Sequence, residues 1–298
     1  MFTIDPKTIK TAELHAYMLS AIAPRPIAFA STIDKDGNAN LSPFSFFNAF
    51  GSHPPIMIFS PARRVRDNTI KHTLENVYDV DEVVINVVNY NMVHQQSLAS
   101  TEYEKGVNEF LKAGFTPLPS QLVKPYRVKE SPVQMECKVK QVIETGTEGG
   151  AGNLIICEML LMHINEDVLD ENKKINQHKI DLVARLGGNY YCRASGTALF
   201  EVEKPHHKKG IGVDGLPEHI RNSRILTGNS LGQLGNCDKL PDDEAIKQFK
   251  LSAKAEHILQ QLHGSQAEKN VQLHFMAQKL LEQNCVADAW EILTLQVQ

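Results

Sequence analysis

Apolar runs with the spacing of β-strands dominate the first two-thirds of the chain. Between residues 132 and 145 apolar and polar positions alternate, which is typical of a strand with one buried face. Residues 154–164 form a more continuously apolar run, and the glycine-rich stretch 146–153 between the two predicts a turn, so we expect a long hairpin. The same criteria predict further strands at residues 26–33, 40–47, 56–60, 82–89 and 197–202. We therefore expect a mainly β domain.

Helical spacing replaces this pattern in the last third of the chain. Asp242 is a candidate N-cap for a helix that extends to about Leu262. Ser265 and Glu268 have the spacing of a capping box, which predicts the start of a second helix. A third helix is expected over residues 286–297. Shorter helices beside the strands are predicted at residues 11–19, 68–77, 92–100 and 108–113.

The composition changes at residues 204–210, where Lys, His and Gly replace the β pattern. We therefore divide the chain into a β domain over residues 1–205 and an α-helical C-terminal extension over residues 206–298.

Composition and charge narrow the classes of function. The 298 residues are 42% hydrophobic and 22% charged, as is usual for a globular protein, and the net charge of −4 argues against nucleic acid or an anionic membrane as the main partner. No apolar run approaches the roughly 18 residues of a membrane span, and the N-terminus lacks a signal-peptide pattern, so we expect a cytoplasmic location. The five cysteines are odd in number and far apart, which favours reduced thiols over disulfides or a zinc site.

One local cluster of cations stands out against this acidic average. Arg63, Arg64, Arg66 and Lys71 precede Thr73 at the start of the helix predicted over residues 68–77. Free N–H groups at a helix start, together with cations and a hydroxyl, suit a phosphate. Taken alone, a cluster of four cations is more often a solvated loop.

Several segments in a fixed order indicate a family. They are APRPIA from residue 23, LSPFSFFN from 41, PP at 54–55, RRVRDN from 63, KHTLEN from 71, ESPVQMEC from 130 and ARLGGNYY from 184. In this order, from about residue 20 to 205, the chain resembles the flavin reductase-like family of FMN-binding split β-barrels, which includes the flavoredoxins.

The resemblance implies a fold and a set of cofactor contacts. The expected fold is a six-stranded Greek-key split barrel with peripheral helices, which dimerises as a homodimer with FMN at the interface. The cationic loop and helix start are expected to hold the FMN phosphate, and the segment around residue 45 to border the isoalloxazine ring. The expected cofactor-binding residues are Ser31, Thr32, Pro43, Ser45, Phe46, Asn48, Ser60, Arg64, Lys71 and Thr73.

The function that the resemblance implies is an FMN-dependent oxidoreductase that takes hydride from NADH or NADPH. Arg185 and Tyr190 are the candidates for lining the nicotinamide slot. No catalytic dyad is expected, because hydride transfer depends mainly on stacking geometry and on donors around the flavin. A flavoredoxin-like electron carrier without efficient NAD(P)H turnover is the alternative. The glycines of residues 146–152 do not precede a helix, so no dinucleotide fingerprint shows the nicotinamide preference.

Two further patterns carry remote alternatives. Gly228, Ser230 and Gly232 fit the nucleophile-elbow spacing of a serine esterase, but no strong strand precedes them, so we expect a turn-rich loop there. His206 and His207 lack a nearby carboxylate cluster, which disfavours a metal site. We therefore predict no metal.

Overall fold

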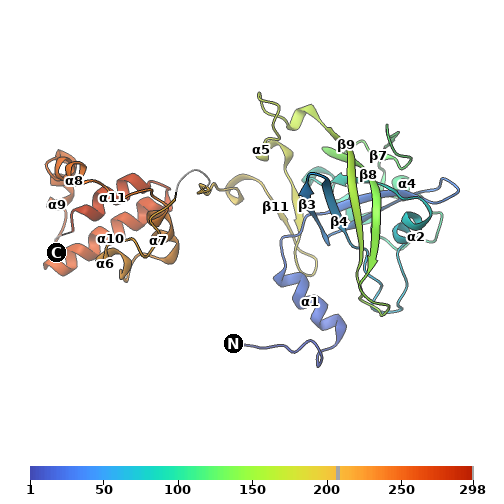
Figure 1. The fold of residues 1–298 in the computed structure, drawn as a ribbon, viewed down its shortest axis with the longest axis horizontal. Helices are drawn as coiled ribbons and strands as arrows, with labels where there is room; N and C mark the ends of the chain where they lie inside the picture. The colour runs from blue at the N-terminus through green and yellow to red at the C-terminus, as the bar shows by residue number, and fades with distance from the viewer. Residues whose placement is uncertain (206–208, 297–298) are drawn as a thin grey trace. The chain divides into compact units, whose positions relative to one another are not determined.

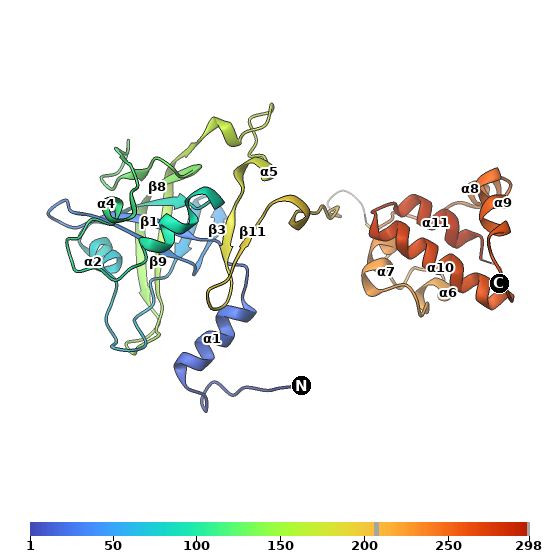
Figure 2. The same ribbon diagram turned by 180° about the vertical axis from the view of Figure 1, so that it is seen from behind.

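The chain divides into two compact units, Met1–Phe200 and Glu201–Gln298. The structure is a computed structural model and describes residues 1–205 and 209–296. Each unit has a hydrophobic core of its own. Figures 1 and 2 show the strands of the first unit and the helices of the second.

A seven-stranded sheet forms the first unit. Its strand order is β2-β1-β5-β8-β9-β4-β3, and every neighbouring pair is antiparallel. The strands are β1 (Ala28–Ile33), β2 (Ala39–Phe44), β3 (Phe47–Ser52), β4 (Pro55–Phe59), β5 (Glu82–Val87), β8 (Val133–Glu144) and β9 (Asn153–Ile164). The predicted hairpin over residues 132–164 is the pair β8 and β9, the longest in the sheet.

The sheet curls so that the end of one edge strand lies close in sequence and space to the start of the other. β2 and β3 lie at opposite edges, yet only Ser45 and Phe46 separate them in the sequence. The sheet order contains no hydrogen-bonded pairing between β2 and β3, so the sheet does not close into a continuous barrel. The predicted count of six strands is wrong, because the chain bends at Ser45 and continues as β3. The Greek-key connection stays a prediction.

Strand β1 is buried on both faces because helices cover it. Ala28 and Ala30 join a core that α2 (His72–Asp79) covers through Leu74 and Val77. Phe29, on the other face, joins a second core to which α3 (Val93–Leu98) and α4 (Glu109–Ala113) contribute. The fold is therefore mixed α/β rather than mainly β. The remaining short elements are η1 (Tyr90–Met92), β6 (Pro117–Leu118), β7 (Arg127–Val128), η2 (Glu166–Val168) and α5 (Gln177–Ile180).

Two predictions about local structure in the first unit are wrong. The helix predicted from residue 68 begins at His72, because Asn68 has a left-handed backbone with φ 56° that cannot start a helix. Residues 197–202 form no strand: a single 3₁₀ turn, η3 (Gly196–Ala198), is followed by irregular chain, and Phe200 is 81% exposed.

A helix and a hairpin that Arg25 connects lie outside the main sheet. α1 (Thr11–Ala21) has no buried residue and projects away from the strands in Figure 1. β10 (Val183–Arg185) and β11 (Tyr191–Arg193) form a separate two-stranded hairpin. Arg25 joins the helix and the hairpin, because it donates to a carbonyl within α1, to the carbonyl of the C-cap residue Ile22 and to Leu186 O.

The described part of the second unit, residues 201–205 and 209–296, contains six α-helices. They are α6 (Glu218–Arg221), α7 (Gly228–Gly235), α8 (Asp243–Lys250), α9 (Ala253–Gln260), α10 (Gln266–Glu282) and α11 (Val286–Thr294). The predicted capping box at Ser265 and Glu268 is confirmed. The single helix predicted from Asp242 is wrong, because Ser252 caps a new helix and divides it into α8 and α9. No described helix is long and apolar enough to cross a membrane.

The nucleophile-elbow pattern lies within this second unit. Ser230 is in α7, not in the expected loop, and is 5% exposed. Its hydroxyl bonds Thr227 in a capping box, and within the described chain it has no hydrogen bond to a histidine. The esterase alternative is therefore not supported, because an elbow needs an exposed serine after a strand. His206 and His207 lie outside the described residues.

Candidate functional site

A hollow in the first unit brings together two of the four cations that the sequence singled out, Arg64 and Lys71. It lies between the edge strand β2, the start of α2 and the segment that follows α3. We call it the cationic hollow, and its lining comprises Asn40, Ser42, Arg64, Lys71, His72, Thr73, residues 99–103 and Glu109. Three predicted site residues, Arg64, Lys71 and Thr73, therefore meet in one place.

The start of α2 offers unpaired donors to this hollow. Lys71 is the N-cap residue, and its side chain does not cap the helix. Within residues 1–205 and 209–296, the N–H groups of His72 and Thr73 have no hydrogen-bond partner. The first N–H groups of a helix carry its positive dipole end, so the hollow attracts an anion.

A buried amide and hydroxyl network supports the helix start. Asn40 Nδ2 donates to Thr73 Oγ1 at 2.9 Å and to Thr32 Oγ1 at 3.3 Å. Asn76 Nδ2 also donates to Thr32 Oγ1, at 3.1 Å. Because Thr73 Oγ1 accepts from Asn40, its own proton is left to donate to a ligand. Sequence reasoning missed both amides, although Asn76 ends the KHTLEN segment and Asn40 directly precedes LSPFSFFN.

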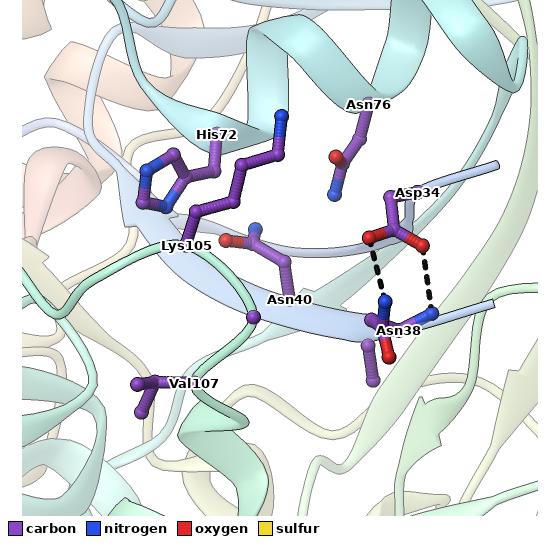
Figure 3. A pocket seen from close by; sticks show the side chains of 9 residues that line it. Asp34, Asn38, Asn40, His72, Asn76, Lys105 and Val107 are labelled. Carbon is purple, nitrogen blue, oxygen red and sulfur yellow. Dashed lines mark hydrogen bonds between the residues drawn. The ribbon is translucent and has the colours of Figure 1, made fainter. Parts of the chain in front are cut away.

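Figure 3 shows the other side of this network. A second hollow shares Asn40 and His72 with the cationic hollow and is lined further by Asp34, Asn38, Asn76 and Lys105, among others. Asp34 accepts from Asn38 through both oxygens, and these hydrogen bonds lower the pKa of the Asp34 carboxyl. In Figure 3, Asn76 extends from the helix toward Asn40, and Asn40 lines both hollows. The network therefore forms a shared wall.

The cations of the hollow are held by neighbouring groups. Arg64 donates from Nε to Glu102 Oε1 at 2.9 Å and from one terminal nitrogen to Thr69 Oγ1 at 2.6 Å. Lys71 Nζ lies 3.9 Å from the same Glu102 oxygen. Burial lowers the pKa of Lys71, and repulsion from Arg64 adds to this. An anionic ligand would raise the pKa of Lys71 by supplying a counter-charge.

A buried carboxyl also lines the hollow. Glu109 is 5% exposed, and its Oε2 accepts from Leu41 N on the edge strand β2 at 3.0 Å. Burial raises the pKa of this carboxyl, despite the hydrogen bond from Leu41. Glu109 thus covers an edge N–H group that would otherwise lack a partner.

The glycine-rich turn between β8 and β9 positions the loop that carries the cations. Arg63 N donates to Ala151 O at 2.8 Å, and Gly150 N donates to Arg63 O at 2.9 Å. A Cβ at Gly149 would lie 3.0 Å from Arg64 O, so only glycine allows this approach. Figure 1 shows the turn and the loop side by side. The glycines predicted the turn, but not its contact with residues 63–68.

A second group of predicted site residues lies where β2 passes into β3. Arg25 Nε donates to Ser45 Oγ at 3.3 Å, and Phe46 O accepts from Ser60 N at 2.8 Å. Phe46 is 36% exposed, and Asn48 is exposed on β3. Sequence reasoning missed Arg25 as a support for this turn, although it belongs to the APRPIA segment.

The two candidates for the nicotinamide slot belong to the β10–β11 hairpin. Arg185 lies with its guanidinium carbon 4.6 Å from the ring centre of Tyr191 and donates to Gly188 O. Tyr190 is 75% exposed. The backbones of Arg25 and Arg185 exchange two hydrogen bonds of 2.9 Å. Arg25 therefore connects the hairpin to the turn at Ser45.

Three further predicted site residues belong neither to the cationic hollow and its supporting network nor to the group around Ser45. The Ser31 hydroxyl is fully buried without a partner in the described chain, and alternation along β1 places it on the face opposite Thr32. Ser60 Oγ accepts from Asn153 N at 3.0 Å, a contact between β4 and β9. Pro43 lies in the edge strand β2, where the missing N–H costs no ladder bond.

Comparison with known proteins assigns the chain to a family. A model of the "Flavin reductase like domain" matches residues 19–183, which is more than half of the chain and contains both groups of residues. The chain belongs to the flavin reductase-like family. Membership supports a flavin as cofactor and an oxidoreductase reaction. The second unit lies beyond the match.

Similar proteins extend this result. An uncharacterised protein of Aquifex aeolicus is 39% identical over 63% of this chain and 94% of its own length. Nitrilotriacetate monooxygenase component B from Bacillus cereus is 25% identical, with a TM-score of 0.63 over 68% of this chain and 98% of its own. A flavin reductase-type protein with a split barrel domain from Shewanella frigidimarina is 24% identical, with a TM-score of 0.57 over 68% of this chain and 100% of its own.

Proposed function

We propose that this flavin reductase-like protein is an FMN-dependent oxidoreductase that accepts electrons from NADH or NADPH. The observation that carries the proposal is the start of α2, where two unpaired N–H groups adjoin Lys71, Arg64 and the Thr73 hydroxyl. This set of donors and charges suits a phosphate that ends a ligand, as in FMN. Lys71, Thr73 and Arg64 would hold that phosphate.

The rest of the cofactor would follow strand β2. Asn40, beside the phosphate seat, and Ser45 are five residues apart, which corresponds to about 16 Å along an extended chain. A ribityl chain and ring that start at the phosphate would therefore reach Ser45, Phe46 and Asn48. The exposed side of Phe46 offers an apolar surface to a ring system. Thr32 contributes indirectly, because it anchors Asn40 and Asn76.

Bound flavin would accept and pass on hydride or electrons, and the protein supplies position and charge. Arg185 and Tyr190 are proposed to border the nicotinamide, since the hairpin that carries them is tied to Ser45 through Arg25. Arg25 is a positioning residue in this scheme. It is 5% exposed and holds the Ser45 hydroxyl.

We further propose that two copies of the first unit form a homodimer. β3 is an edge strand with five exposed residues, and Phe50 on it is 64% exposed. Leu160 and Met162 on β9 are also exposed, as are Tyr17 and Met18 on α1. Exposed apolar side chains on an edge strand favour cover by another chain. In this proposal residues 1–205 carry the cofactor site and the dimer contact, and residues 206–298 are an added helical domain.

The test of this function uses the purified full chain. Any flavin released by heat is identified by chromatography, and NADH and NADPH oxidation is followed with added FMN, FAD or riboflavin. We expect FMN to be the preferred flavin and its presence to support nicotinamide oxidation. FMN binding without nicotinamide oxidation would favour the carrier function instead. A preference for FAD, or no affinity for any flavin, would contradict the cofactor assignment.

A further inference from the structure

A single carboxylate already occupies the place that we assign to the flavin phosphate. Glu102 Oε1 accepts from Arg64 Nε at 2.9 Å and lies 3.9 Å from Lys71 Nζ. Glu102 Oε2 pairs with Arg66. Three cations from the loop before α2 thus converge on one anion that belongs to the protein itself. The hydrogen bond from Arg64 is the largest cause of the lowered pKa of Glu102, so the carboxylate stays charged near neutral pH.

Glu102 can move out of the hollow without disturbing a helix or strand. Its side chain is 37% exposed, whereas that of Arg64 is 16% exposed. Glu102 lies in the irregular segment between α3 and α4, so its departure breaks no strand or helix. In the described chain, the segment is tied to the start of α2 and the loop before it by Glu102 and by the Lys105–Glu75 ion pair. A movement confined to this segment would therefore open the hollow.

A phosphate and the Glu102 carboxylate cannot both occupy the hollow at low cost. Each is an anion, and like charges a few ångströms apart repel strongly in a partly buried site. Both seek the same donors, Arg64 and Lys71. The binding of the phosphate therefore requires the displacement of Glu102. The free energy of the Glu102 contacts is subtracted from the free energy of phosphate binding.

We propose that Glu102 is an internal competitor for the phosphate seat, so that the flavin exchanges as a diffusible substrate and does not stay bound as a prosthetic group. The inference rests on the proposed function, because it needs the phosphate to lie in the cationic hollow. It assigns Glu102 the role of setting affinity and exchange rate. A flavin without phosphate gains nothing from the three cations, so Glu102 affects its binding little.

The test compares FMN with riboflavin, which lacks the phosphate, on the full chain with Glu102→Gln. Affinities are measured by fluorescence titration and release rates after rapid dilution. We expect FMN to bind about tenfold more tightly to the variant and to leave more slowly, because loss of one competing charged hydrogen bond is worth about that factor. Riboflavin affinity should stay the same. Glu102→Ala should change FMN binding in the same direction.

The matched control is Glu104→Gln, two residues further along the same segment. Glu104 is exposed, and its side chain makes no hydrogen bond or ion pair within the described chain. Glu104→Gln should leave the affinities for both flavins unchanged. A tenfold gain in FMN affinity with this control would overturn the inference, because the loss of any negative charge in the segment would then explain the effect.

The outcomes separate the inference from the proposed function. If wild-type protein prefers FMN to riboflavin but Glu102→Gln binds FMN equally or more weakly, Glu102 positions Arg64 for the ligand and the competition is overturned. If neither the wild-type protein nor Glu102→Gln binds FMN more tightly than riboflavin, the phosphate seat is wrong and the inference is overturned with it.

Discussion

The two ends of strand β2 differ in how much of the proposed flavin site a single chain supplies. At the end near Asn40, one chain supplies a helix start, three cations and a buried network that fixes Thr73. At the other end, Phe46, Asn48 and the strand β3 are exposed, with Arg25 as the main buried support. This contrast motivates our proposal that a single subunit builds the phosphate seat, while a second copy completes the surroundings of the flavin ring.

The largest expected effect concerns the incomplete end. Phe50→Asp places a charge on the exposed face of β3, where we expect dimer contact. Each dimer loses two buried rings, so its dissociation constant should rise by about 100-fold or more. Analytical ultracentrifugation measures this, and flavin affinity should fall with it.

The control for this change is Phe200→Asp. Phe200 is 81% exposed in irregular chain after the β10–β11 hairpin, and its substitution should not change the association. A dimer that survives Phe50→Asp would place the contact elsewhere.

A smaller effect on flavin binding is expected at the end of β2 near Asn40, where we place the phosphate. Gly149→Val forces side-chain atoms against Arg64 O and Val65 O, so the cation loop must shift. Overpacking of this kind costs about 1–3 kcal/mol. FMN affinity should fall about tenfold, while riboflavin affinity changes little because the ring end is untouched. Titration with both flavins measures the difference.

Gly228→Ala provides the comparison for that variant. An added Cβ at Gly228 meets no atom within 4 Å, so flavin binding should stay at the wild-type level. An equal loss for FMN and riboflavin in Gly149→Val would show general damage to the fold and would not support a role of the turn in phosphate binding.

The smallest effect is expected from removing the second unit. The second unit has a separate hydrophobic core, and the family match ends at residue 183. Truncation after Pro205 should therefore leave FMN affinity within about twofold of the full chain, as for distant sites. Light scattering should still show a dimer. A monomer without flavin affinity would mean that the helical domain belongs to the functional core.

Local pattern predicted most of the strands, and contacts distant in sequence explain what it missed. The β8–β9 hairpin follows from alternation, and the capping box at Ser265 follows from two residues. β3 was missed because residues 47–52, FNAFGS, lack alternation and gain their strand form by pairing with β4. The wrong start of α2 has a local cause, the left-handed backbone of Asn68, which the sequence does not display.

The site was predictable only as far as the family segments reach. Arg64, Lys71 and Thr73 were found by residue type and order, and they line one hollow. Glu102 and Glu109 were missed, because their partners Arg64 and Leu41 lie 38 and 68 residues away. Ionic and edge-covering contacts over such separations depend on the folded chain.

The central claim is that the cationic hollow binds the phosphate of FMN. It is tested most directly by the affinities of the wild-type chain and Lys71→Ala for FMN and riboflavin, measured side by side. We expect the wild-type chain to prefer FMN, and Lys71→Ala to lose about 1.5–3 kcal/mol of FMN binding, the worth of a charged hydrogen bond. Riboflavin binding should not change. Equal affinity of the wild-type chain for the two flavins, or an equal loss for both in Lys71→Ala, would contradict the claim.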